Sequence, residues 1–383
     1  MALVNGFALT CKNMTDSDTG KVKERCACDF RINIFGCPES NALIILYYVL
    51  LVVTIIHGIV SGYFLYHGVV RRRMNVFFPP TRDRGVLRPK PQDAFHIMVV
   101  IFSIMQIGYI SVLLSNGWAN TRGAELGHNL PRVVAFGLAG MLPISIAYST
   151  PATSNETSLW APSKTILDVL GFFQIIGPAL TQLPLSWTTG TFADKGDVLN
   201  ARRFFEIQYM VVGIWSGLYT GIVWIVWYNL KKILNEHHQI LRERVISDNK
   251  WKLMMLKRVE GKLTTVSMAF TQISFVYIFA SFIGEFFHEN LIFIRAVYFL
   301  CFAVWNFTMP VAFAITQGVF IYCILRPVPK LPTHISSSFR PMAAECWLQL
   351  AIIQWRIWKD ARWDEGTSSE GEQCVNEKEQ SDG

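Results

Sequence analysis

Charged residues are scarce in this chain. Asp, Glu, Lys and Arg make up 16% of its 383 residues, against about 25% in soluble domains. Apolar residues make up 51% of the chain. They gather in nearly uncharged runs of roughly 18 to 30 residues, and a helix of that length crosses a ~30 Å hydrocarbon core. Because lipid offers the backbone no hydrogen-bond partner, each run must be helical. The composition predicts an all-α, polytopic membrane protein.

Enzyme signatures are also missing. The chain has no HExxH, GxSxG, P-loop or dinucleotide-binding pattern. The adjacent His237 and His238 lie in a basic stretch with no evident metal partner. We therefore expect no enzyme, no metal and no cofactor. The net charge of +7 is concentrated in particular loops, so it does not indicate nucleic-acid binding.

Seven apolar segments are long enough to span a membrane. They are Ala42–Tyr66, Ala94–Leu114, Val133–Thr150, Thr165–Leu185, Tyr209–Leu230, Leu263–Phe287 and Leu291–Leu325. The chain start, Met1–Met14, lacks the apolar core of a cleavable signal peptide, so we expect the first segment to be the signal anchor. The prediction is a seven-transmembrane helix bundle at 42–325.

Lysine and arginine are concentrated in two of the predicted loops. Loop one carries Arg71, Arg72, Arg73, Arg82, Arg84, Arg88 and Lys90, and loop five carries Lys231, Lys232, Arg242, Arg244, Lys250, Lys252, Lys257, Arg258 and Lys262. Positive loops stay in the cytoplasm. We therefore expect the N-terminus outside, the C-terminus in the cytoplasm, and the plasma membrane as the location, with an internal membrane as the alternative.

The predicted external segment, residues 1–41, holds four cysteines. Cys11, Cys26, Cys28 and Cys37 allow two disulfides in three possible pairings, and four unrelated thiols are the alternative. Asn13-Met14-Thr15 is a glycosylation sequon that is useful only on the outside. The sequon at Asn155 falls in a predicted cytoplasmic loop, so we expect it to be unused.

Two further segments follow the predicted bundle. The segment at 326–363 contains a Trp-rich, basic stretch at 340–363, which is typical of an amphipathic helix lying in the inner headgroup layer. The tail at 364–383 is rich in Glu, Ser and Gly, so we expect it to be disordered. Loop five, by contrast, predicts basic helical extensions of the spans on either side of it.

Three groups of residues inside the spans invite a functional interpretation. Gly213, Gly217 and Gly221 recur every four residues, which predicts close helix approach, either in a homodimer or inside the bundle. Pro310 should kink the last span, and Asn306 lies one turn earlier on the same face. This pair is either a hinge or a static kink.

The third group is a predicted ligand pocket near the outer ends of the last two spans. It consists of Ser281, Glu285, Arg295 and Tyr298. Polar groups in a span normally face the bundle interior or a water-filled cavity. The alternative is an ion pair between Glu285 and Arg295 that fixes two helix ends.

The predicted plan resembles that of G-protein-coupled receptors. The resemblance covers most of the chain as architecture: seven spans, an external segment with a sequon, a basic fifth loop and a helix after the last span. The motifs of the rhodopsin-like class do not appear. The third span ends Ala147-Tyr148-Ser149-Thr150 where that class has an acidic-Arg-aromatic triplet, and Asn306-Phe307-Thr308-Met309-Pro310 stands in place of NPxxY.

The resemblance implies a receptor that senses an extracellular ligand and signals to a heterotrimeric G protein through loop five. Lipid is the other expected partner. The alternatives are a transporter, a lipid-handling protein, or an inverted seven-helix channel similar in length to insect chemoreceptors. Against a transporter, the predicted spans hold no deep ionisable residue except His57. Against the channel, the loop charges favour the opposite orientation.

Overall fold

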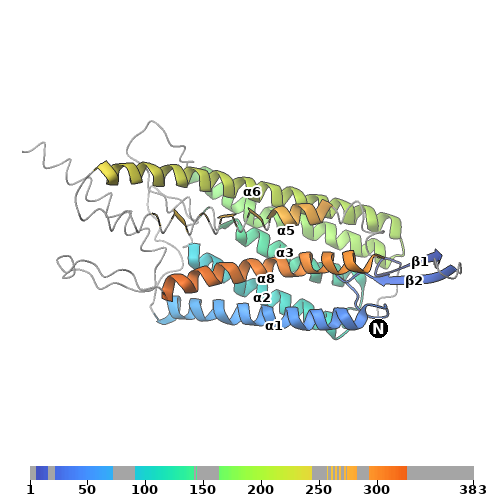
Figure 1. Cartoon of the computed structure of the whole chain (residues 1–383). Coiled ribbons are helices and arrows are strands. Elements are labelled where there is room, and N and C mark those ends of the chain that lie inside the picture. The colour runs from blue at the N-terminus through green and yellow to red at the C-terminus, as the bar shows by residue number, and fades with distance from the viewer. Residues whose placement is uncertain are drawn as a thin grey trace, which may run out of the picture. The chain divides into compact units, whose positions relative to one another are not determined.

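The computed structural model describes most of the chain up to residue 325 (Figure 1). The described residues are 6–15, 22–71, 91–141, 144, 164–243, 257, 260–261, 264, 267–268, 271–272, 274–282 and 293–325. The predicted interfacial helix and tail, together with Asn155 and Glu285, lie outside this part of the chain.

The described chain is mostly helical. Its helices are α1 (Ser40–Leu65), which continues into the π-helical turn η1 (Tyr66–Arg71), α2 (Pro91–Leu114), α3 (Thr121–Ala139), α5 (Lys164–Asp194), α6 (Val198–Glu243) and α8 (Arg295–Leu325). The described residues of the predicted sixth span, among them 274–282, are helical as well. The passage of α6 beyond Leu230 to Glu243 confirms a helical extension into loop five.

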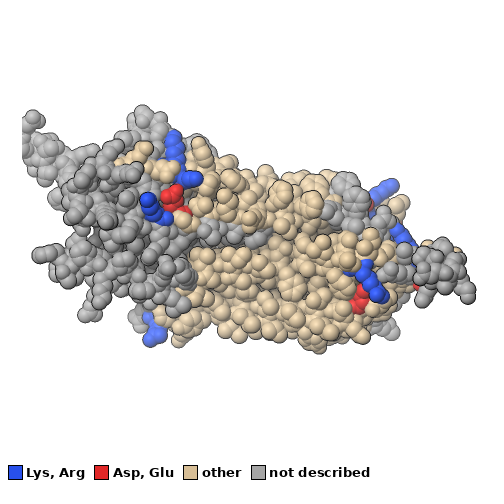
Figure 2. Space-filling view, viewed as in Figure 1, with Lys and Arg blue, Asp and Glu red and all other residues tan. Residues whose placement is uncertain are grey.

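Five described helices are long and apolar enough to cross a membrane: Ser40–Arg71, Asp93–Leu114, Asp168–Asp194, Val198–Lys232 and Arg295–Ile321. On the face shown in Figure 2, the coloured charged side chains lie toward the two ends of the helices, with an uncharged band between them. The chain therefore has the build of an integral multi-pass membrane protein. Seven spans and their orientation stay predictions.

A β-hairpin precedes the helices and was not predicted. Strands β1 (Leu9–Thr15) and β2 (Val22–Cys28) pair antiparallel with Cys11 opposite Cys26. We call the end of the bundle at which it lies the hairpin end. The four cysteines form two disulfides, Cys11–Cys26 and Cys28–Cys37, which confirms the prediction and selects one of the three pairings. Asn13 is exposed on β1, and its glycosylation stays a prediction.

Helix α3 begins earlier than the sequence predicted. Residues 121–132 were assigned to loop two, but they form the first turns of α3. The start is fixed by two caps: the Asn120 side chain accepts from Gly123 N at 2.7 Å, and the Asp194 carboxylate of α5 accepts from Thr121 N at 2.7 Å. These carboxylate and amide oxygens satisfy N–H groups that a helix start leaves open.

Helices α3 and α5 approach closely at two levels. A Cβ added to Gly190 would lie 2.3 Å from the Cα of Arg122, and one added to Gly137 would lie 2.6 Å from the Ile175 carbonyl oxygen. Only glycine leaves room for backbone at these positions. Beyond α5, the chain turns at Gly196, whose φ is +80°, and enters α6. The predicted loop four is therefore mostly helix.

Candidate functional site

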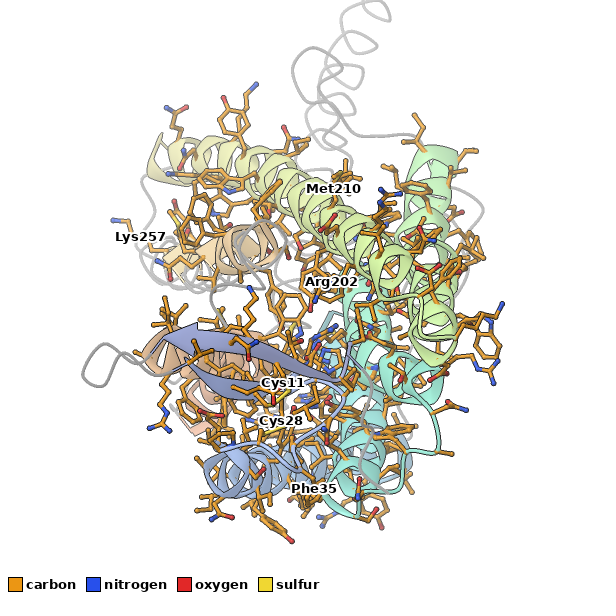
Figure 3. The ribbon with its side chains drawn as sticks, turned by 90° about the vertical axis from the view of Figure 1, so that its right-hand side faces the viewer. Cys11, Cys28, Phe35, Arg202, Met210 and Lys257 are labelled. Atoms are coloured by element: carbon orange, nitrogen blue, oxygen red, sulfur yellow. A yellow bond between two sulfur atoms is a disulfide. The ribbon has the colours of Figure 1, made fainter. Side chains whose placement is uncertain are left out.

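Residues 28–37 form a short loop closed by the Cys28–Cys37 disulfide, which we call the capping loop. Its turn is set locally, because the Asp29 carboxylate accepts from Arg31 N at 3.1 Å and the Asp29 carbonyl accepts from Asn33 N at 2.9 Å. Such Asx turns are favoured by the short Asp side chain. Viewed from the hairpin end, Cys28 and Phe35 lie over the helix ends (Figure 3).

The capping loop is packed into the bundle rather than lying on its surface. Phe30, Ile32 and Ile34 are all buried, and they belong to the same apolar core as residues of α1, α2, α6 and α8. Phe30 meets Tyr298 and Phe302 edge to face at 5.5 and 5.4 Å between ring centroids. The loop thus contributes core side chains to a bundle that the sequence assigned to residues 42–325.

Arg31 is the charged centre of this packing and is only 2% exposed. Its guanidinium pairs with Asp29 in its own loop and with Glu125 of α3, at 3.1 Å. Burial alone would lower the pKa of Arg31, but the carboxylates of Asp29 and Glu125 raise that pKa above its ordinary value. Arg31 therefore carries its positive charge inside the protein.

Aromatic rings of α6 cover the same guanidinium. The Cζ atom of Arg31 lies 4.2 Å from the ring centroid of Phe205 and 5.7 Å from that of Tyr209. A desolvated cation over an aromatic face is attracted by the ring quadrupole. Together with Glu125, these rings bind the flat guanidinium by charge, by hydrogen bonding and by its faces.

Three tyrosines from three helices hold the backbone of the capping loop. Tyr298 of α8 donates to the Cys28 carbonyl at 3.0 Å, Tyr47 of α1 donates to the Phe30 carbonyl at 2.7 Å, and Tyr109 of α2 donates to the Arg31 carbonyl at 2.6 Å. Buried carbonyls need such partners. The helices therefore recognise the path of the loop as well as its side chains.

A hydrogen-bond chain continues from the loop into the bundle. Trp305 of α8 donates to Nε2 of His128 at 3.0 Å, since an indole N–H can only donate. Nδ1 of the same ring lies 3.1 Å from the Tyr109 hydroxyl and 3.1 Å from Nη1 of Arg132. The series of hydrogen bonds thus runs from Trp305 through His128 and Tyr109 to the Arg31 carbonyl. We call the residues of this chain, with Asp29, Arg31, Glu125, Arg132 and Asn306, the Arg31 cluster.

The predicted hinge pair meets the Arg31 cluster at Asn306. Arg132 of α3 donates to the Asn306 side-chain oxygen at 2.9 Å, and the Asn306 amide donates to the Phe302 carbonyl at 3.0 Å. Pro310 follows one turn later, inside α8. Hinge motion stays a prediction, but α3 holds α8 one turn before the proline.

The predicted pocket residues are only partly brought together. Tyr298 lies under the capping loop, whereas Arg295 pairs with Glu39 at 3.2 Å and keeps its side chain 68% exposed. Ser281 is buried. Because Glu285 lies outside the described residues, its pairing with Arg295 stays a prediction.

The glycine ladder of α6 divides into two environments. Gly213 is buried, and a Cβ added to it would lie 3.7 Å from Phe282, which is an ordinary contact distance. Gly217 and Gly221 are exposed, and no described atom lies within 4 Å of a Cβ added to either. Packing at Gly213 and a homodimer face at the other two therefore both remain predictions.

A second polar cluster lies among α1, α2 and α8, further along these helices from the capping loop. Gln317 binds Nδ1 of His57 at 2.6 Å and donates to Ser61 at 2.8 Å, and Ser61 in turn contacts Nδ1 of His96 at 3.1 Å. We call these four buried residues the Gln317 cluster. His57 is therefore a hydrogen-bonded interior histidine.

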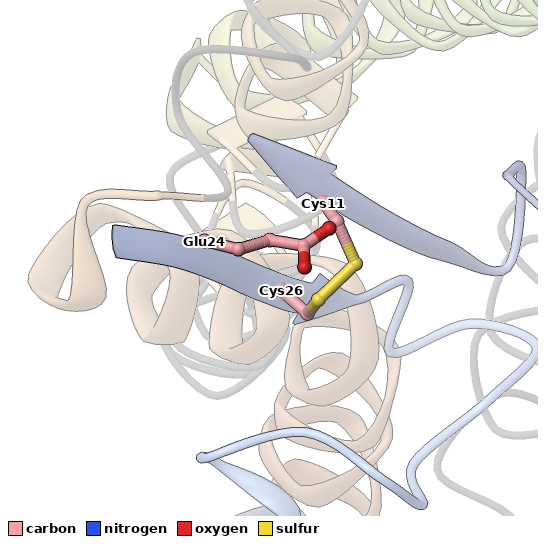
Figure 4. Close-up of side chains that lie close together, drawn as sticks. All are labelled: Cys11, Glu24 and Cys26. Atoms are coloured by element: carbon pink, nitrogen blue, oxygen red, sulfur yellow. A yellow bond between two sulfur atoms is a disulfide. The ribbon is translucent and has the colours of Figure 1, made fainter. Parts of the chain in front are cut away.

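One group near the hairpin has metal-ligand residue types. Cys11, Glu24 and Cys26 lie close together on β1 and β2 (Figure 4). However, the two sulfurs are bonded to each other, and a metal is bound by the free thiolate. In the oxidised protein this group is a disulfide beside a surface carboxylate, so it offers no metal site.

Sequence reasoning missed the main residues of the Arg31 cluster. Asp29 and Arg31 lie in the predicted external segment, and Glu125 lies in the predicted second loop. The available signal was the spacing of Glu125, His128 and Arg132, which places all three on one face of a helix. Comparison of the chain with protein-family models, curated proteins and solved structures finds no match, so function is argued from geometry.

Proposed function

We propose that the protein is a seven-helix membrane receptor of the G-protein-coupled type, sensing its ligand at the hairpin end. One observation carries the proposal: the Arg31 cluster connects the capping loop to α3 and to α8, next to Pro310. Moving the capping loop leaves Glu125 without its buried counter-charge, which is costly. The helices must then adopt another packing, and a ligand that favours that packing shifts the population.

Helix α6 gives this rearrangement a route to the other end of the bundle. Phe205 and Tyr209 contact Arg31 near its start, and the helix continues to Glu243, beyond the apolar stretch that ends at Lys232. The predicted basic loop five follows directly. In this proposal a heterotrimeric G protein binds there, on the cytoplasmic side.

A transporter is the second candidate, and a specific observation favours it. The predicted spans held no deep ionisable residue except His57, which counts against a transporter. In the structure, Glu125, His128 and Arg132 are also buried among the helices. Gln208 of α6 is fully buried, and neither of its amide atoms has a hydrogen-bond partner among the described residues. Such groups are typical of hydrated substrate or ion paths.

The first test compares Asn306→Ala with the wild type in cells that carry nucleotide-exchange sensors for each class of Gα subunit. Loss of the Asn306 acceptor frees Arg132, so we expect basal exchange to rise about fivefold at unchanged surface expression. Thr316→Ala is the matched control, because this buried hydroxyl of α8 donates to Ala312 in its own helix. Its basal exchange should equal that of the wild type.

The receptor proposal is contradicted if no Gα class exchanges nucleotide in cells with the wild type or with Asn306→Ala, while both proteins reach the surface normally. Solute flux in proteoliposomes containing only this protein would then support the transporter.

A further inference from the structure

We propose that the hairpin end is a binding site for the arginine side chain of a peptide, and that the chain's own Arg31 occupies it here. The ligand class follows from the chemistry around Arg31: a guanidinium-binding pair of a carboxylate and an aromatic ring, next to hydroxyls that bind peptide carbonyls. An external arginine-bearing peptide would bind by displacing the capping loop.

The guanidinium subsite distinguishes arginine from lysine. Glu125 meets the guanidinium from α3 at 3.1 Å, while Phe205 of α6 lies against its face at 4.2 Å. A flat, delocalised cation uses both contacts at once, whereas an ammonium is a compact point charge. The subsite is thus built for the shape of a guanidinium as well as its charge.

The backbone subsite adds recognition of a peptide. Hydroxyls of Tyr298, Tyr47 and Tyr109 donate to two carbonyls that precede the arginine and to the arginine's own carbonyl. These bonds depend on peptide carbonyls and not on side-chain identity. Any peptide that follows the same path and carries an arginine at the same place therefore satisfies them.

The capping loop has the character of a self-contained ligand. Its ends are joined by the Cys28–Cys37 disulfide, and its turn is stabilised by its own Asp29. Such a pre-ordered ring loses little conformational freedom on binding. It therefore retains its shape when it leaves the site, as exchange with an external peptide requires.

This inference rests on the proposed function only in naming the displacing peptide as the receptor's ligand. Its test measures binding in purified protein and needs no G protein, so the inference and the receptor proposal can fail separately.

The test uses full-length Arg31→Ala protein purified in detergent. This change removes the atoms of an ethylguanidinium ion, so that ion is the probe, and propylammonium is the matching probe for lysine. We expect millimolar ethylguanidinium to raise the Tm of Arg31→Ala by at least about 3 °C in a saturable manner. Propylammonium should leave it unchanged.

Two controls accompany this measurement. Neither ion should raise the Tm of the wild type, whose subsite is filled, nor that of Arg203→Ala, which removes an exposed arginine from α6. If Arg31 forms only a structural ion pair and there is no binding site, ethylguanidinium should not stabilise Arg31→Ala. That result, or equal stabilisation by propylammonium, overturns the guanidinium subsite.

The peptide itself is tested next. A disulfide-closed peptide with the sequence of residues 28–37 should stabilise Arg31→Ala at a lower concentration than ethylguanidinium does, because it also meets the tyrosines. The same peptide with alanine in place of its arginine should have no effect. Failure of the arginine peptide, with ethylguanidinium active, overturns displacement of the capping loop.

A second measurement applies if Arg31→Ala does not fold. Phenylglyoxal modifies accessible arginines, and mass spectrometry locates the adducts. We expect Arg31 to be protected in the wild type and labelled at least about tenfold faster in Glu125→Gln, which removes the negative charge of its α3 partner while keeping its size. Arg203 should be labelled equally in both proteins. Equal protection of Arg31 in both would show that Glu125 does not hold the guanidinium and would overturn the subsite.

Discussion

The two polar clusters of the bundle, the Arg31 cluster and the Gln317 cluster, differ in charge, although both contain residues of α2 and α8. The Arg31 cluster holds a buried cation between two carboxylates, and part of it comes from a loop outside the helices. The Gln317 cluster contains an amide, a hydroxyl and two imidazoles, all from helices. Neutral groups lose little when a partner moves, whereas a buried charge without its partner is strongly destabilising. Of the two clusters, only the Arg31 cluster ties a segment outside the helices to the helix packing by buried charge.

Of the variants that compare the two clusters, Glu125→Ala should lower the free energy of unfolding most. It leaves Arg31 buried with Asp29 as its remaining carboxylate, and we expect the free energy of unfolding to fall by about 3–5 kcal/mol. Reversible unfolding in detergent measures it. Glu39→Ala is the control, because its partner Arg295 is largely exposed, and the cost there should be about 1 kcal/mol or less. Equal losses in the two variants would remove the distinction between buried and exposed pairs.

Opening the capping loop should have the next largest effect. The double variant Cys28→Ser/Cys37→Ser releases a short closed loop, and chain entropy gives a loss of about 2–3 kcal/mol. The same experiment on Cys11→Ser/Cys26→Ser is the comparison, because that disulfide joins the two strands of the hairpin. Chain entropy gives a similar loss for the second variant, so a larger loss in the first variant, measured by circular dichroism of the helices, reports the contacts of the capping loop with the bundle. The reverse order would contradict a structural role for the capping loop.

Gln317→Leu should have the smallest effect. It removes contacts to His57 and Ser61 but leaves no ion uncompensated, so we expect a loss of about 1 kcal/mol, close to measured interhelical hydrogen bonds in membranes. The same unfolding assay applies. A loss as large as that of Glu125→Ala would mean that the two clusters carry equal energetic weight.

The apolar helices were the most predictable part of the fold. The predicted first and second spans, Ala42–Tyr66 and Ala94–Leu114, agree with α1 and α2 because uninterrupted apolar runs have few other stable structures in lipid. The cysteines of the predicted external segment also form disulfides, although their spacing left the pairing open.

The candidate site was much less predictable, for two physical reasons. Hydropathy treats Glu125, His128 and Arg132 as loop residues, because it does not register that buried polar groups can satisfy one another. Arg31 presents the second difficulty: its partner Glu125 is 94 residues away, so only the tertiary structure brings the charges together. The local sequence pattern predicts where a helical segment lies. A long-range ion pair depends on how the segments pack together, which the local pattern does not contain.

The length of α6 has a mechanical consequence. Its 46 residues, at 1.5 Å each, make a rod of about 69 Å, more than twice the thickness of a hydrocarbon core of about 30 Å. Phe205 and Tyr209, which contact Arg31, lie near one end of this rod, and Glu243 forms the other. Tilting a rigid rod of this length by about 5° about its first end displaces the far end by about 6 Å. A tilt of this size would convert a sub-ångström adjustment beside the guanidinium into a displacement the size of a side chain at the opposite end of the helix.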